Sequence, residues 1–196
     1  MSIKDLLFNH LIKSVSISSD QIDHMIRSGR LKLLKKKDCL FKEGEVAKYV
    51  GYITKGCLKY YQIDDKGEEQ IVYFAIEDWW IGDLNSFYSG KPSTYYLQAL
   101  EDTELLLFTK VEFDQIRKDI PAFDEFCKIR HAKATDARME TLISQRSESA
   151  EERYLKLLQK IPDIFQRVPQ HLIATYLGIK PPSLSRIRKQ LTEKKK

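Results

Sequence analysis

The chain has 196 residues, 42% hydrophobic and 31% charged, with a net charge of +5, a composition that excludes a disordered chain, a fibrous repeat and a membrane protein. No apolar run approaches the roughly 20 residues of a membrane-spanning helix, and residues 1–10 lack the pattern of a secretion signal, so we expect a cytoplasmic protein. Three cysteines, Cys39, Cys57 and Cys127, lie far apart without neighbouring Cys or His residues at metal-ligand spacing, which argues against a metal site.

Two short helices are expected before residue 30. Ser18 and Gln21 have the spacing of a capping box, in which each residue bonds the backbone of the other at the start of a helix. Apolar residues recur at helical intervals after them, and Gly29 stands where such a helix would end. An earlier helix is expected at about residues 5–11.

From residue 31 to residue 109 the pattern changes to short β-type runs separated by turn residues. Val, Ile, Tyr, Phe and Leu are concentrated in these runs, and Gly56 and Gly67 fall at two turns between neighbouring runs. The spacing predicts an all-β sandwich or barrel. The expected strands are residues 31–34, 39–41, 49–54, 57–63, 68–74, 95–100 and 104–108.

A long helix is expected after the strands. Thr109 and Glu112 form a second capping box, and Pro121 opens a stretch without internal Gly or Pro that extends to about Arg146, on the order of 39 Å. A helix of this length needs a partner, which is either the same helix of a second copy or the β domain of its own chain. Its apolar residues are Phe123, Phe126, Ile129, Ala134, Ala137, Met139, Leu142 and Ile143.

A small C-terminal unit is expected after a polar hinge at residues 147–149. Ser149 and Glu152 form a third capping box at the start of its first helix. Residues 151–196 contain 11 Lys and Arg against 4 Asp and Glu, a net charge of +7, whereas the rest of the chain contains 22 and 24. This concentration of positive charge favours binding of a polyanion at that end.

Residues 170–190 fit two short helices that cross steeply. Such a pair needs a small residue at the contact, a glycine at the turn and apolar residues in the angle, and Ala174 and Gly178 meet the first two needs. The apolar set is Ile173, Leu177, Ile179, Leu184 and Ile187. The outward residues of the second helix are polar or cationic, as is required of a helix that lies in a DNA major groove. They are Ser183, Ser185, Arg186, Arg188 and Lys189.

With these residues and the motifs at residues 40–45, 54–59, 65–69 and 82–83, nearly the whole chain resembles the Crp/Fnr family of bacterial regulators. The resemblance implies an α+β fold with three parts. Residues 1–120 form a sensor domain of the cyclic-nucleotide-binding type, which is a double-stranded β-helix or jelly roll. Residues 121–146 form a dimerisation helix, and residues 147–196 form a winged helix-turn-helix-like DNA-binding domain. It also implies a homodimer on a pseudo-palindromic operator, with recognition helices about 34 Å apart.

The resemblance also assigns roles to single residues. Arg186 falls on the guanine-reading arginine of the family, Ser185 on a neighbouring base-contacting position and Ser183 on a phosphate-contacting hydroxyl. Pro182 replaces the usual base-reading glutamate of the family, and Pro181 replaces an arginine seen in the Crp branch, so the operator of better-known members cannot be transferred. The full set of expected DNA contacts is Gln170, Lys180, Ser183, Ser185, Arg186, Arg188 and Lys189.

The expected effector pocket departs from that of cyclic-nucleotide binders. Asp83 replaces a ribose-binding Glu, and Ser93 with Thr94 replaces an Arg-Ser or Arg-Thr pair that holds the cyclic phosphate. A phosphate without a charged partner loses its strongest contacts, each worth about 1.5–3 kcal/mol, which argues against cyclic AMP. A different small molecule in a pocket formed by Gly82, Asp83, Ser93, Thr94, Tyr95 and Tyr96, or no effector at all, remains open, and no cofactor is expected.

We therefore expect a transcription regulator that binds double-stranded DNA, with RNA polymerase as a further partner that this function allows. The alternative is a regulatory subunit whose cyclic-nucleotide-type domain acts on a protein. A cupin-type enzyme is disfavoured because its metal centre needs histidines on strands, whereas His10, His24, His131 and His171 all fall in expected helices.

Overall fold

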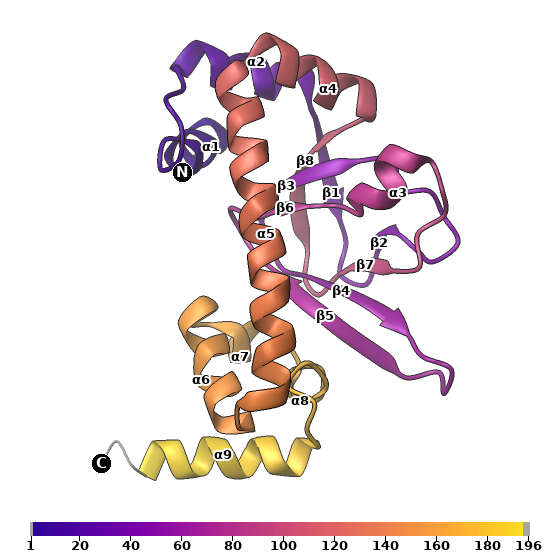
Figure 1. Cartoon of the computed structure of the whole chain (residues 1–196), viewed down its shortest axis with the longest axis vertical. Helices are drawn as coiled ribbons and strands as arrows, with labels where there is room; N and C mark the ends of the chain where they lie inside the picture. Colours follow the sequence, from indigo (N-terminus) through magenta and orange to yellow (C-terminus); the bar gives the residue numbers. More distant parts are fainter. Residues whose placement is uncertain (1, 194–196) are drawn as a thin grey trace.

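The computed structural model describes residues 2–193, except the side chains of Arg138, Thr141, Leu142, Gln145, Arg146 and Thr192. A β-roll (residues 30–108) with helices on one side is connected through the long helix α5 to a group of helices at the other end of the molecule (Figure 1). None of the helices in this described part is long and apolar enough to cross a membrane.

The strands agree closely with those expected from the alternation of apolar and polar residues. They are β1 (Arg30–Leu34), β2 (Cys39–Phe41), β3 (Val50–Lys55), β4 (Leu58–Ile63), β5 (Glu69–Ala75), β6 (Trp80–Ile81), β7 (Tyr96–Ala99) and β8 (Thr103–Phe108). Strand β6 was not predicted, because two residues are too few to show an alternating pattern. The helices are α1 (Ile3–Leu11), α2 (Ser19–Ser28), α3 (Leu84–Ser89), α4 (Lys110–Asp119), α5 (Pro121–Ser147), α6 (Ala150–Lys160), α7 (Ile164–Arg167), α8 (Gln170–Tyr176) and α9 (Pro181–Glu193).

The β-roll consists of two antiparallel four-stranded sheets, in the orders β1-β8-β3-β6 and β2-β7-β4-β5. Fully buried side chains such as Ile53, Leu58, Leu97 and Leu105 fill the space between the sheets. The jelly-roll class expected from the sequence is therefore confirmed. The outer face of the first sheet packs against α1, α2, α4 and the first turns of α5.

All three capping boxes expected from the sequence are present. The hydroxyl of Ser18 accepts from the Gln21 amide at 3.2 Å, that of Thr109 from the Glu112 amide at 3.4 Å, and that of Ser149 from the Glu152 amide at 3.2 Å. Each cap satisfies amide groups that the first helical turn leaves without partners. These short-range signals fix the starts of α2, α4 and α6.

Helix α5 divides into two parts with different surroundings. Phe123 and Phe126 are 0% and 3% exposed and belong to the core of the chain's own β domain. Met139 and Ile143 are 61% and 60% exposed in the single chain, while the side chain of Leu142 lies outside the described residues. The N-terminal part of α5 therefore packs on the β domain of its own chain, whereas the large apolar side chains described in its C-terminal half, Met139 and Ile143, are exposed.

The C-terminal unit is helical. Helices α6 to α9 share one apolar core, and no described residue after Phe108 lies in a strand. The wing of a winged helix-turn-helix is therefore absent from the described residues, which corrects that detail of the expected fold. A wing is a β-hairpin outside the helix pair, and its presence was inferred from the family resemblance rather than from any strand pattern in residues 147–196.

His10 is a buried titratable group on α1. Its ring contacts Tyr52 and Phe126, with ring centroids 5.7 and 5.4 Å apart, and its Nε2 atom has no hydrogen-bond partner among the described residues. Burial lowers the pKa of this imidazole, opposed by the nearby Asp78 carboxylate and assisted by the positive charge of Arg130 and Lys13. The folded state therefore favours the neutral ring.

We expect the free energy of unfolding to fall as the pH drops below about 6.5, where His10 takes up a proton in the unfolded chain but not in the folded one. The loss continues until the pH passes the lower pKa of the folded state. Denaturant titrations between pH 7.5 and pH 5.5 measure the effect, which should be smaller in His10→Phe. Equal pH dependence in both proteins would contradict this assignment.

Candidate nucleic-acid interface

The turn between α8 and α9 is a Schellman motif centred on Gly178. This glycine has a φ of +67°, its amide donates to the Thr175 carbonyl at 3.0 Å, and the Ile179 amide donates to the Ala174 carbonyl at 3.0 Å. Left-handed backbone of this kind favours glycine, because a Cβ atom strains it. The position that the sequence assigned to the turn is confirmed.

Apolar residues fill the angle between the two helices, as the sequence indicated. Ala174 and Leu184 are both 0% exposed, so that α8 and α9 approach each other at a small side chain. The remaining members of the set belong to the same cluster, with Ile173 and Leu177 buried and Ile179 and Ile187 partly buried. The cluster also includes Tyr154, Leu157 and Ile164, so α6 and α7 support the helix pair.

Arg153 of α6 fixes the helix pair to the α5–α6 hinge. Its guanidinium donates to the Leu177 carbonyl at 3.0 Å and to the Glu148 carbonyl at 2.6 Å. Leu177 is the C-cap residue of α8 and Glu148 that of α5, so this one side chain satisfies carbonyl groups at two helix ends. Sequence reasoning missed this residue, because the contact joins positions 24 residues apart.

We expect Gly178→Ala to destabilise the C-terminal unit by about 1–2 kcal/mol, the usual cost of left-handed backbone for a residue with a Cβ atom. No atom lies within 4 Å of the position that a Cβ would occupy, so the cost is conformational rather than steric. Gly178→Asn should cost less, because asparagine tolerates this conformation. Denaturant unfolding measures both, and equal losses for Ala and Asn would contradict the conformational explanation.

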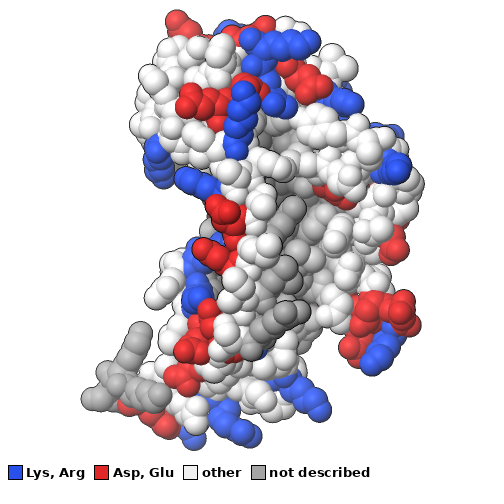
Figure 2. All heavy atoms as spheres, in the orientation of Figure 1, with Lys and Arg blue, Asp and Glu red and all other residues white. Residues whose placement is uncertain are grey.

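One side of α9 is polar, exposed and not covered by any other part of the described residues. Ser185, Arg186 and Lys189 are exposed, and the Arg186 guanidinium has no hydrogen bond or ion pair with any described residue. Figure 2 shows basic side chains projecting from the lower edge of the molecule, where Figure 1 places α9. The helix begins at Pro181 and Pro182, where an amide is not needed for helical hydrogen bonds.

Not all expected DNA contacts lie on this side. Arg188 is half-buried and stacks on the Phe165 ring, with its guanidinium carbon 4.4 Å from the ring centroid. Ser183 is half-buried as well, whereas Lys180 and Gln170 are exposed near the starts of α9 and α8. The structure therefore groups Ser185, Arg186 and Lys189 and separates Arg188 from them.

Gln190 belongs to the exposed side and was missed. It is exposed and follows Arg186 by four residues, which is about one helical turn. Helical spacing from Arg186 was the available signal. A glutamine side chain has the donor and acceptor pair that reads adenine in the major groove, so Gln190 joins the candidate set.

The polar residues of the expected effector pocket bind one another. Asp83 accepts from the amides of Asn85 and Ser86, both at 3.1 Å, and so caps α3. Its other carboxylate oxygen accepts from the Ser93 hydroxyl at 2.7 Å, and Ser93 is 3% exposed. Thr94 is exposed. Asp83 and Ser93, which stand at the positions of the ribose and phosphate contacts, are thus brought together. Because they hydrogen-bond each other, neither side chain is available to a ligand.

The tyrosines of the expected pocket are packed in stacks. The Tyr95 ring stacks on Tyr60 with centroids 4.6 Å apart, and Tyr60 stacks on Tyr73 at 4.8 Å. On the adjacent position Tyr96 stacks on Tyr61 at 5.0 Å. These stacks join neighbouring strands of the second sheet. In this structure the aromatic residues act as core and as cross-strand contacts.

No group of three His, Cys, Asp or Glu side chains within the described residues has the arrangement of a metal site. His10, His24, His131 and His171 lie in α1, α2, α5 and α8, as expected. The thiol of Cys57 is fully buried, and burial raises its pKa to about 12. That thiol is therefore a core group rather than a reactive one.

Comparison with known proteins supports this architecture. Residues 24–119 match the family model described as "Cyclic nucleotide-binding domain". The transcriptional activator protein anr of Pseudomonas aeruginosa is 26% identical over 184 residues, which is 86% of this chain and 72% of that protein. The fumarate and nitrate reduction regulatory protein of Vibrio cholerae is 25% identical over 181 residues, 86% of this chain and 70% of that protein.

Solved structures of the same type superpose on nearly the whole chain. The c-di-GMP-responsive regulator CLP of Xanthomonas campestris has a TM-score of 0.71 at 14% identity, with 90% of this chain and 93% of that chain covered. FixK2 of Bradyrhizobium japonicum has a TM-score of 0.69 at 19% identity, with 85% of each chain covered. Over most of its length the chain is similar to regulators of the Crp/Fnr type. This similarity agrees with the motifs noted in the sequence, and the two relatives and CLP are named as regulators rather than enzymes.

Proposed function

We propose that this protein is a sequence-specific transcription regulator of the Crp/Fnr type that binds double-stranded DNA as a homodimer. Helix α9 enters the major groove, where Arg186 reads a guanine, Ser185 and Gln190 contact neighbouring bases, and Lys189 and Lys180 contact phosphates. Two copies related by two-fold symmetry then occupy the two halves of a pseudo-palindromic operator. The relatives named above are transcriptional activators and regulators, which supports this function.

The proposal rests mainly on one observation: α8 and α9 are well packed against each other, while the other side of α9 is exposed. Ala174, Gly178 and Leu184 fix the crossing of α8 and α9, and the exposed guanidinium of Arg186 faces solvent on the opposite side. A helix pair used only for packing has no need of this exposed, positively charged side. A subunit that regulates a partner protein has no need of it either, which sets aside the alternative raised by the sequence.

Homodimerisation is proposed through the C-terminal half of α5. Met139 and Ile143 lie four residues apart, so they share one side of the helix, and both are more than half exposed. An uncovered apolar stripe on a long helix is typical of a helix that packs against a partner helix. RNA polymerase is a further partner of a bound activator in this scheme.

We further propose that cyclic nucleotides are not the effector of the β-roll. The Asp83–Ser93 hydrogen bond at 2.7 Å occupies the groups that would hold a ribose and a phosphate. Stacked Tyr95, Tyr60 and Tyr73 rings fill the adjacent part of the roll. The protein therefore responds to a ligand of another kind or acts without a small-molecule effector.

A salt titration of DNA binding tests the proposed function. The full-length protein first selects fragments from random DNA, and its affinity for them is then measured by gel shift at increasing salt concentrations. The logarithm of the affinity should fall linearly with the logarithm of the salt concentration, with a slope of about −0.9 for each phosphate contacted. The selected fragments should share a pseudo-palindromic sequence. Failure to retain any DNA at low salt would overturn the proposal.

A further inference from the structure

Arg167, the last residue of α7, joins the C-terminal unit to the end of the β-roll. One edge of its guanidinium donates to both carboxylate oxygens of Glu77, at 2.9 and 2.8 Å. The other edge donates to one oxygen of Glu101, at 3.1 and 2.6 Å. The arginine side chain is 13% exposed. We call Arg167, Glu77 and Glu101 the junction cluster.

The acidic half of the junction cluster is held in place by the β-roll itself. Glu77 lies between β5 and β6, and its carboxylate also accepts from the Gly56 amide, in the β3–β4 turn, at 2.7 Å. Glu101 lies between β7 and β8, where its carbonyl accepts from the Thr103 hydroxyl at 2.8 Å. Two turns at one end of the roll therefore supply carboxylates to a single arginine, and a third turn supports one of them through the Gly56 amide.

Gly56, whose amide bonds Glu77, cannot be replaced by a residue with a side chain unless its surroundings shift. Gly56 has a φ of +108°, and a Cβ atom there would lie 2.4 Å from the Thr103 hydroxyl oxygen. Burial raises the pKa of the Glu77 carboxyl, but hydrogen bonds from Arg167 and the Gly56 amide outweigh it and hold that pKa below its ordinary value. The carboxylate is therefore charged at neutral pH, as a strong bidentate pair with arginine requires.

Apolar contacts surround the junction cluster. Cys57, Phe74 and Leu100 of the β-roll belong to the same buried cluster as the helices of the C-terminal unit. The Phe74 ring contacts Tyr176 of α8, with centroids 5.5 Å apart. The side chain of Arg167 is 13% exposed, whereas those of Glu77 and Glu101 are 34% and 35% exposed, so the two ion pairs are partly screened by solvent. The polar and apolar contacts together connect α7 and α8 to the end of the roll.

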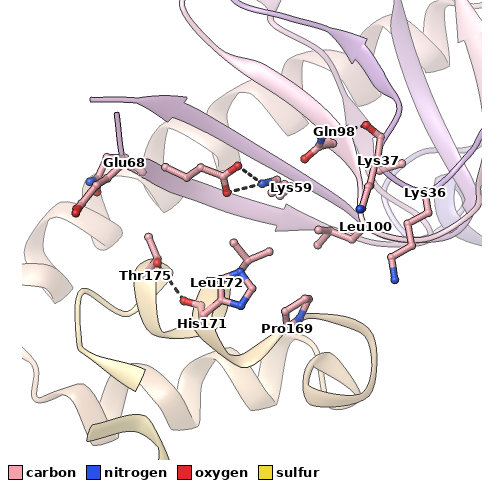
Figure 3. Close-up of a pocket in the computed structure, with 13 residues that line it drawn as sticks. Lys36, Lys37, Lys59, Glu68, Gln98, Leu100, Pro169, His171, Leu172 and Thr175 are labelled. Atoms are coloured by element: carbon pink, nitrogen blue, oxygen red, sulfur yellow. Dashed lines mark hydrogen bonds and ion pairs between the residues drawn. The ribbon is translucent and has the colours of Figure 1, made fainter. Parts of the chain in front are cut away.

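Beside these contacts a groove separates part of the second sheet from α8. It has a volume of about 610 Å³ and lies between the second sheet and α8 (Figure 3). Lys36 and Lys37 of the roll stand on one side, and His171 and Thr175 of α8 on the other. Since packing is interrupted there, the angle between the roll and α8 depends on the ion pairs of Arg167 and on the apolar contact between Phe74 and Tyr176.

We infer that Arg167 is a positioning residue for DNA binding, which holds α8 and α9 at the angle that presents Arg186. This inference rests on the proposed function. The exposed side of α9 is already uncovered in the joined arrangement, so the junction cluster pre-organises a binding-competent state rather than blocking it. Without the cluster, DNA binding has to pay for orienting a mobile unit, which lowers affinity.

The test is Arg167→Gln in the full-length protein, with affinity for a selected fragment measured across salt. We expect affinity about tenfold weaker than wild type at each salt concentration, with an unchanged salt slope, because no phosphate contact is lost. Arg167→Lys, which keeps the charge but loses the bidentate geometry, should bind with intermediate affinity. The exchanged pair Arg167→Glu with Glu101→Arg should recover part of the loss relative to Arg167→Glu alone.

Arg30→Gln is the matched control, because Arg30 also pairs with a glutamate, Glu112 at 2.8 Å, but within the N-terminal unit. It should bind DNA as the wild type does. Circular dichroism and thermal unfolding check that each variant is folded. The protease cleavage rate at residues 147–149 of the native protein should rise in Arg167→Gln, which reports loosening of the C-terminal unit independently of DNA.

Three outcomes overturn the inference while the proposed function stands. The first is that Arg167→Gln is folded and binds DNA with wild-type affinity. The second is a smaller salt slope for Arg167→Gln than for the wild type, which would make Arg167 a phosphate contact. The third is that neither Arg167→Lys nor the exchanged pair recovers binding. Absence of DNA binding by the wild-type protein itself would instead overturn the proposed function. The two failures are therefore distinguished by the wild-type measurement.

Discussion

Replacing Met139 and Ile143 together by glutamate is expected to convert the dimer to a monomer and to weaken operator binding by about 10²–10⁴-fold. The two residues are 61% and 60% exposed in the single chain and share one side of α5. Facing carboxylates in a helix pair repel each other and cannot be solvated there. Once one half-site is bound, the second binds as an intramolecular event, and this avidity is lost in a monomer.

Sedimentation equilibrium measures the oligomeric state, and a gel shift on the same selected fragment measures the affinity. Val111→Glu is the matched control, since Val111 is an apolar residue of α4 that is 80% exposed but lies outside the proposed seam. It should remain dimeric and bind DNA normally. A double-glutamate variant that is folded and still dimeric would show that the copies associate through another surface.

The helix pair was readable from the sequence because each of its requirements is local. Ala174 and Gly178 are four residues apart, and the apolar residues that fill the angle lie within the same short segment. A turn that needs left-handed backbone selects glycine whatever the rest of the protein does. The capping boxes at Ser18, Thr109 and Ser149 were readable for the same reason, since each satisfies amides of its own first turn.

The junction cluster was not readable, because its members are far apart in the sequence. Arg167 lies 90 residues from Glu77 and 66 from Glu101, and nothing local marks a charged residue as one half of such a pair. The orientation of Arg188 was missed for a related reason. Its place on a polar stretch suggested exposure, but the guanidinium stacks on Phe165 of another helix. Long side chains with charged ends pack wherever an apolar face is offered.

The effector pocket shows a different limit of sequence reasoning. The absence of an arginine beside Ser93 was visible in the sequence and argued against a cyclic phosphate. The hydrogen bond between Asp83 and Ser93 could not be read from the sequence, because it depends on the fold. The fold brings α3 and the segment before β7 together. A missing ligand contact can be read from residue types, whereas its internal replacement depends on geometry.

Arg186→Ala is expected to cost about 1–3 kcal/mol of operator binding and to relax the preference at one base pair in each half-site. The guanidinium is exposed on α9 and free of described partners, so its removal leaves the folded protein undisturbed. Paired donors of an arginine match the two acceptors of guanine in the major groove, and alanine has none. Binding to a panel of fragments that differ at single positions measures both effects.

Lys189→Ala and Arg27→Ala are the two comparisons that separate base reading from general charge. Lys189 lies on the same side of α9 and should, as a phosphate contact, weaken all sequences equally and reduce the salt slope by about 0.9. Arg27 is exposed on α2, at the opposite end of the molecule in Figure 1, and should have no effect on either quantity. If Arg186→Ala instead behaves as we expect of Lys189→Ala, with a uniform loss and a lower slope, Arg186 holds a phosphate. Specificity would then have to come from other residues on the exposed side of α9, of which Ser185 and Gln190 are the first to test.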